Sequence, residues 1–118
     1  MSELVVSWER AFQVWQYSVS HSQVILRSVD PRRYTTRIDL TFVGIRAMHV
    51  RDSYESLTVT REEPDGRAIM DPSWLSEPLQ CFVVNGGPDY LLATNFGWHE
   101  DHGDHHTPSK FGPLPGTE

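Results

Sequence analysis

The sequence has little of several features, and each scarcity excludes a class of protein. Cys81 is the one cysteine, so no internal disulfide framework can form. No stretch approaches the roughly 18 unbroken apolar residues that a membrane helix needs. The N-terminus lacks the basic start and long apolar run of a secretory signal. We therefore expect a cytoplasmic protein that does not bind membranes.

The 118 residues are enough for one domain with one modest core. Apolar runs recur through most of the chain, whereas residues 107–118 hold three prolines and two glycines without periodicity. We predict a single β-rich domain over residues 1–106, followed by a loosely ordered tail over residues 107–118.

The hydrophobic periodicity is that of β-strands. Ile38, Leu40 and Phe42 alternate with polar residues, which is the clearest period-two pattern in the chain. Other short runs are rich in β-branched and aromatic residues and recur about every ten residues. This spacing predicts an antiparallel β-sandwich or a small open barrel of about seven short strands. The one expected helix is a short one near residues 71–77, with Asp71 as its N-cap.

The net charge of −6 is concentrated in the second half of the chain. Residues 1–60 hold seven arginines and six acids, a balance of +1, whereas residues 61–118 hold three basic residues and ten acids, a balance of −7. Nucleic-acid binding needs a basic stripe. The densest basic patch is only Arg32-Arg33 with Arg37 nearby, which we interpret as a solvated loop. We expect no nucleic-acid partner; the acidic half favours a basic protein partner or simply solubility.

Four tryptophans in so short a chain predict either a core or a binding surface. Trp15 lies in a strand pattern and is assigned to the core. Trp74 and Trp98 adjoin acidic or proline-containing segments and are candidates for exposure. With nearby acids they form the predicted partner-binding set, which is Trp74, Trp98, Glu62, Glu63, Asp65, Glu100, Asp101 and Asp104.

Four of the six histidines fall within residues 99–106, together with three acids. Neutral imidazole binds Zn and Ni, and carboxylates can complete the coordination shell. On a helix, His99, His102 and His106 would share one face, although Gly103 argues against a helix there. The plain alternative is a hydrophilic segment after the last strand. The candidate Zn or Ni ligands are His99, His102, His105 and His106, and no other cofactor is expected.

The sequence contains no catalytic motif. His21 lies between two serines, but neighbours on a strand point to opposite faces, so we expect neither serine to reach its ring. Cys81 stands in an apolar run and is expected to be buried and inert. Asp39 lies on the polar face of its strand and is expected to pair with a cross-strand arginine such as Arg27, at the surface or between sheets. These patterns favour a protein that is not an enzyme.

The segment Phe12–Ser28, FQVWQYSVSHSQVILRS, followed by Ile38–Gly44, IDLTFVG, resembles small β-rich bacterial proteins, some of which look like immunity proteins. Immunity proteins are acidic intracellular domains that neutralise toxins. The resemblance covers about a third of the chain. It implies a β-rich fold and a protein partner, and it supplies no catalytic residues.

The leading hypothesis is therefore a small, immunity-like, protein-binding module that uses its acidic C-terminal half. The first alternative is a metal-binding protein that uses the histidines of residues 99–106. The second is a small-molecule-binding β-barrel whose cavity is lined by Trp and Tyr side chains. Homodimerisation through an edge strand is compatible with all three hypotheses.

Overall fold

A computed structural model of the chain describes residues 3–30, 32–62 and 78–102, and all regular structure in them is β-strand. The strands are β1 (Glu3–Trp8), β2 (Phe12–Ser18), β3 (Gln23–Ser28), β4 (Arg37–Val43), β5 (Ala47–His49), β6 (Ser53–Tyr54), β7 (Leu57–Glu62), β8 (Gln80–Val84), β9 (Tyr90–Ala93) and β10 (Asn95–Asp101). The predicted helix near 71–77 and the predicted tail over 107–118 lie outside the described residues. None of the described residues belongs to a helix that could cross a membrane.

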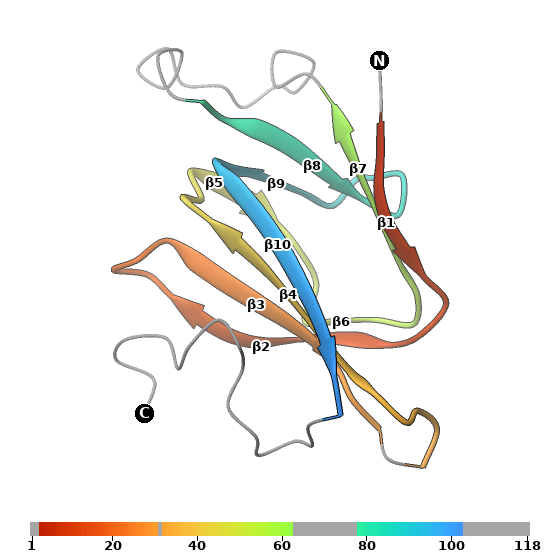
Figure 1. Ribbon diagram of the computed structural model, residues 1–118. Coiled ribbons are helices and arrows are strands. Elements are labelled where there is room, and N and C mark those ends of the chain that lie inside the picture. Colours follow the sequence, from red (N-terminus) through yellow and green to blue (C-terminus); the bar gives the residue numbers. More distant parts are fainter. Residues whose placement is uncertain (1–2, 31, 63–77, 103–118) are drawn as a thin grey trace.

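The strands form two antiparallel five-stranded sheets that pack face to face (Figure 1). We call sheet A the one with the order β1-β7-β8-β9-β5, and sheet B the one with the order β10-β4-β3-β2-β6. Neither sheet closes on itself, so the predicted sandwich is confirmed and the architecture is not a closed barrel. The described part has ten strands rather than about seven, because single runs of sequence bend and supply a strand to each sheet.

One such bend joins β4 to β5 and lies against the bend that joins β9 to β10. Thr94 N–H donates to Val43 O over 3.0 Å, and Arg46 N–H donates to Leu92 O over 2.9 Å, so the pairing continues around the corner. Gly44 adopts a φ of +71° at this point. A Cβ there would overlap the Oγ1 atom of Thr94. Only glycine therefore fits both the left-handed backbone and the close approach of the neighbouring chain.

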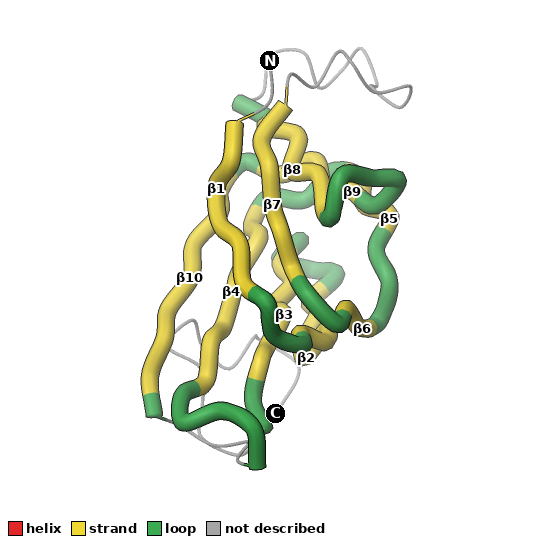
Figure 2. The backbone as a smooth tube through the Cα atoms, turned by 90° about the vertical axis from the view of Figure 1, so that its right-hand side faces the viewer, coloured by secondary structure: helices red, strands yellow, loops and turns green. Residues whose placement is uncertain are grey.

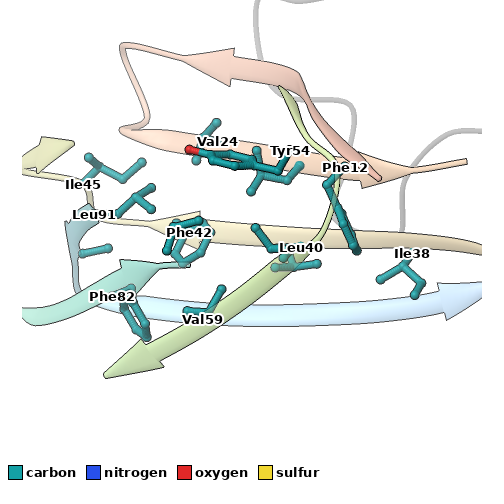
Figure 3. Close-up of a cluster of buried hydrophobic side chains, with 14 residues drawn as sticks. Phe12, Val24, Ile38, Leu40, Phe42, Ile45, Tyr54, Val59, Phe82 and Leu91 are labelled. Carbon is teal, nitrogen blue, oxygen red and sulfur yellow. The ribbon is translucent and has the colours of Figure 1, made fainter. Parts of the chain in front are cut away.

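The core lies between the two sheets and is almost entirely aliphatic and aromatic (Figure 3). Ile38, Leu40 and Phe42 point into it from β4, as their alternation predicts. Phe42 packs against Phe82 of β8 and Phe96 of β10, with ring centroids 5.4 and 5.1 Å apart. Each fully buried side chain of this size contributes about 1.5–3 kcal/mol. This burial holds the two sheets together and fixes the position of their edges.

The Trp15 prediction is wrong, because Phe12 and Val14 are the side chains of β2 that pack on the core, and alternation then places Trp15 on the outer face of sheet B. Trp15 is only partly buried and its ring covers the guanidinium of Arg27 at 4.5 Å. It therefore packs on a charged group and not in the core between the sheets, which a period-two pattern alone does not indicate.

Candidate functional site

One open side of the sandwich carries exposed aromatic surface. β1 is the last strand of sheet A and β10 is the last strand of sheet B, and both lie on the same side of the molecule (Figure 2). Val6 and Trp8 of β1 and Phe96 of β10 border the core there, and Trp98 of β10 contacts Trp8. We call these four residues the aromatic edge.

Trp98 is the most exposed member of the aromatic edge. It lies opposite Leu40 in the register of β10 and β4, so it shares the inward face of sheet B. Its indole is nevertheless 47% exposed, because no further strand lies beyond β10 in the described residues. The Trp8 ring meets it edge-on, with centroids 5.3 Å apart and an interplanar angle of 75°. The prediction that Trp98 is exposed is confirmed.

Both strands of the aromatic edge also leave backbone groups without a ladder partner. Within the described chain, β1 pairs only with β7 and β10 pairs only with β4. Leu4 of β1 is 63% exposed on the outer face of sheet A, opposite Thr60 in the register. Edge strands of this kind accept another strand unless they are blocked. The aromatic edge thus combines apolar area with free backbone hydrogen-bonding groups.

Two of the predicted partner-binding acids bind arginines of their own chain. Asp101 accepts from Arg37 at both oxygens, with Nε–Oδ1 and Nη2–Oδ2 distances of 3.0 and 2.7 Å. Glu100 accepts from the Thr36 hydroxyl at 2.6 Å and lies 3.9 Å from Arg10 Nη1. Burial lowers the pKa of Arg10, while the charges of Tyr34 and Glu100 act in the opposite direction.

The other predicted partner-binding residues are not brought together on the described surface. Glu62 ends β7 opposite Cys81 and is partly buried. The residues of the set that lie outside the described part are Glu63, Asp65, Trp74 and Asp104. Of the eight, the described structure therefore places Trp98, Glu100 and Asp101 near one another on β10.

A row of polar side chains crosses the outer face of sheet B, one from each strand. In order across the sheet these are Ser53, Gln13, Arg27, Asp39 and His99. Arg27 donates to Asp39 through Nε and Nη2, at 2.8 and 3.1 Å. The predicted Arg27–Asp39 pair is confirmed, although both side chains are only 2% exposed and the pair is buried. A bidentate geometry is what a buried pair needs to offset the loss of hydration.

The histidines of the predicted metal site are partly described. His99 belongs to β10, so the expectation of a hydrophilic segment after the last strand is wrong at this position. Its Nε2 atom lies 3.6 Å from Asp101 Oδ2, and His102 Nδ1 lies 3.2 Å from Thr35 O. The described residues contain no group of three or more His, Cys, Asp or Glu side chains placed to hold a metal ion. His105 and His106 lie outside them, and the metal hypothesis stays a prediction.

The opposite open side of the sandwich, between β5 and β6, carries a polar group of residues instead. Asp89 is 3% exposed and accepts a 2.7 Å hydrogen bond from the Tyr54 hydroxyl. That hydroxyl accepts from the Arg51 backbone N–H at 2.9 Å. His49 Nδ1 and Arg51 Nε lie 3.2 and 3.5 Å from the carboxylate oxygens. We call His49, Arg51, Tyr54 and Asp89 the Asp89 cluster.

The Asp89 cluster also changes the acidity of its tyrosine. Burial is the main cause that raises the pKa of Tyr54 to about 12; the Arg51 N–H lowers it, and the hydrogen bond to Asp89 raises it further. The hydroxyl is therefore a stable hydrogen-bond donor at neutral pH. Sequence reasoning missed this cluster, because Tyr54 and Asp89 are 35 positions apart and neither belongs to a recognisable motif.

The expectation for His21 also needs correction. The hairpin between β2 and β3 turns with Ser22 at a φ of 49°, so residues 19–22 are not extended. The Ser20 hydroxyl consequently lies 2.9 Å from His21 Nδ1, within reach of the ring. His21 has no carboxylate within ion-pair distance among the described residues. A serine–histidine contact without an acid to orient the imidazole is not a triad.

The Cys81 side chain is fully buried, as predicted. Comparisons with protein-family models, with curated proteins and with solved structures find no match to this chain.

Proposed function

We propose that this chain is a protein-binding module and that its partner docks on the aromatic edge. The observation that carries the proposal is the 47% exposure of Trp98, an indole on the core side of its sheet with no strand beyond it in the part of the chain that the structure describes. Tryptophan side chains in partly desolvated positions are the commonest centres of binding energy at protein interfaces. The adjoining Trp8 ring supports the indole from one side.

The free backbone edges of β1 and β10 favour a partner that contributes an extended segment. Such a segment would pair with one edge strand and bury its own apolar side chains against Trp98 and Trp8. Main-chain hydrogen bonds would supply affinity, and the indole would supply specificity. This mode needs no catalytic residue, in keeping with the absence of a catalytic motif in the sequence.

Charge favours a basic partner. The chain carries −6 overall, and Glu3, Glu9 and Glu100 are exposed near the aromatic edge. Charges at the rim of an interface increase the association rate more than they increase the equilibrium affinity. The resemblance to immunity proteins supports the same proposal, with a basic toxin as the partner.

The test is capture of a partner from native lysate by the purified wild-type chain and by two variants. In Trp98→Ala the proposed anchor is removed, whereas Tyr17→Ala removes an aromatic ring of similar exposure, 42%, from β2. We expect one stoichiometric partner with the wild type and with Tyr17→Ala. With Trp98→Ala we expect at least about tenfold weaker affinity, measured on the isolated complex.

Added salt should lower the association rate of that complex more than it raises the dissociation rate. The proposal fails if no stoichiometric partner is captured at low salt, or if the two variants bind equally well. A Trp98-dependent doubling of the mass in solution would identify a second copy as the occupant and would equally reject a separate partner.

A further inference from the structure

A pocket of about 490 Å³ lies away from the aromatic edge, at the end of sheet B where β2 begins and β3 ends. The loop over residues 32–34 and the connection from β6 to β7 complete its wall. Its volume lies within the range of pockets that bind small molecules, about 300–1,000 Å³. The second sequence alternative, a small-molecule site, therefore has a place in this fold, although in an open sandwich and without tryptophan in the lining.

Arginines dominate the charged lining of the pocket. Arg27, Arg32 and Arg33 line it, against two acids, Asp30 and Glu55. Arg27 is committed to Asp39. Asp30 is engaged by Arg32, whose backbone N–H donates to it at 3.0 Å and whose Nε lies 3.6 Å away.

Arg33 is the arginine that a ligand can use. It is exposed, and no carboxylate lies within ion-pair distance of it among the described residues. Its guanidinium lies over the Tyr34 ring, 5.1 Å from the centroid. Arg10 lies 4.1 Å from the same centroid, and the Tyr34 hydroxyl accepts from the Ala11 N–H at 3.1 Å. The Tyr34 ring that supports Arg33 is thus held from two sides. The guanidinium is therefore partly ordered before a ligand binds, and it loses less conformational entropy on binding.

The rest of the lining divides into apolar and neutral polar parts. Phe12 and Tyr54 belong to the core cluster and border the pocket. Gln13 and Ser53 are exposed partners in the β2–β6 register and can donate or accept hydrogen bonds. The pocket therefore offers a cation, an apolar wall and two adaptable polar groups within one small volume.

We infer that this pocket binds a small organic anion, one that joins a carboxylate or phosphate group to an apolar body. The guanidinium of Arg33 matches the paired oxygens of either group, because both present a planar or forked pair of acceptors. The apolar body lies against Phe12 and Tyr54, and Gln13 and Ser53 select its polar substituents. This inference does not depend on the proposed protein partner, which docks at the aromatic edge.

The test uses three probes: phenyl phosphate, benzoate and inorganic phosphate. Each is titrated into the ¹⁵N-labelled full chain while amide and arginine Nε resonances are followed by NMR. We expect saturable shifts at Gln13, Arg33 and Tyr34 with one or both aromatic anions below about 10 mM, which is within the range of a weak specific site. The stronger of the two identifies carboxylate or phosphate as the preferred group.

Two variants make the test specific. Arg33→Gln should weaken the binding at least about tenfold. Arg46→Gln, which removes an exposed arginine at the β4–β5 bend outside the pocket, should leave it unchanged. The inference is overturned if no probe gives saturable shifts at these residues, or if both variants weaken binding equally. It is also overturned if inorganic phosphate binds as well as the aromatic anions, because the apolar wall would then have no role.

Discussion

The sandwich has two open sides, at each of which both sheets end, and different kinds of residue occupy them. At the β5/β6 side, a buried carboxylate collects a tyrosine hydroxyl, an imidazole and a guanidinium into the Asp89 cluster. At the β1/β10 side, two tryptophan rings meet edge-on and one stays 47% exposed. Both sides end a pair of sheets, with β5 and β6 at the first and β1 and β10 at the second (Figure 2). The first is built around a buried carboxylate and the second around exposed aromatic rings.

The difference shows how two kinds of interaction serve two purposes. A hydrogen bond to a carboxylate has a fixed geometry, and it becomes stronger where water is excluded. Such a bond is therefore suited to a permanent link between the sheets. Exposed aromatic surface has no fixed partner, and its contact with any complementary apolar surface is favourable in free energy. We therefore expect the Asp89 cluster to stabilise the fold, whereas the aromatic edge is the surface on which we propose that a partner docks.

Among changes at the two open sides, the largest effect on stability should come from removing the carboxylate of the Asp89 cluster. Asp89→Ala leaves the buried Tyr54 hydroxyl without its acceptor and removes the carboxylate that the Arg51 guanidinium and the His49 ring contact. We expect the free energy of unfolding to fall by about 3 kcal/mol, measured by urea denaturation. Asp52→Ala, at an exposed carboxylate, is the control and should change stability by less than about 0.5 kcal/mol. Equal effects would mean that the cluster does not link the sheets.

A smaller effect is expected from Tyr54→Phe, which keeps the ring in the core (Figure 3) and removes only its hydroxyl. The free energy of unfolding should fall by about 1–2 kcal/mol at neutral pH. The variant should also change the pH dependence. The pKa of Tyr54 is raised from 10.0 to about 12 in the folded protein, so the unfolded chain loses this proton first.

Rising pH therefore favours the unfolded state between about 10 and 12, and wild-type stability should fall across that window. Tyr54→Phe should show a shallower decline, because it lacks the titrating hydroxyl. Denaturation curves at pH 9, 10 and 11 would measure both slopes. Parallel curves for the two proteins would contradict the assignment of this hydroxyl to the cluster.

The smallest stability effect should come from Trp98→Ala at the aromatic edge. Because the indole is 47% exposed, its removal should lower the free energy of unfolding by only about 1 kcal/mol. Phe82→Ala, in a fully buried position, should lower it by about 3–5 kcal/mol. If Trp98→Ala proves as destabilising as Phe82→Ala, the aromatic edge is part of the core and the contrast between the two sides disappears.

Much of the fold is predictable from local pattern. The alternation of Ile38, Leu40 and Phe42 places β4 and its buried face correctly, because side chains in a strand alternate between faces. The Arg27–Asp39 pair is also predictable in identity, since both residues share the polar face of neighbouring strands. Its burial is not, because period two distinguishes the two faces of a strand and says nothing about what covers each face.

The candidate sites were predicted less completely. Trp98 can be identified from the sequence because the chain has few tryptophans and acidic residues adjoin this one. Its place beside Trp8 depends on which strands end each sheet. The Asp89 cluster and the pocket at Arg33 had no local signal, because their members come from segments that are remote in sequence. Arg32 and Arg33 are exposed in a loop, as interpreted from the sequence, but a basic dipeptide carries no information about a neighbouring cavity.

The sequence by itself determined the all-β class, the position of the clearest strand and the concentration of negative charge in the second half of the chain. Strand order, the bends that divide one run between two sheets, and the contrast between the two open sides were decided only by the tertiary structure. The physical reason is that alternation and propensity act over a few neighbouring residues. Strand pairing and side-chain clusters instead depend on contacts between distant residues, which a single sequence does not record.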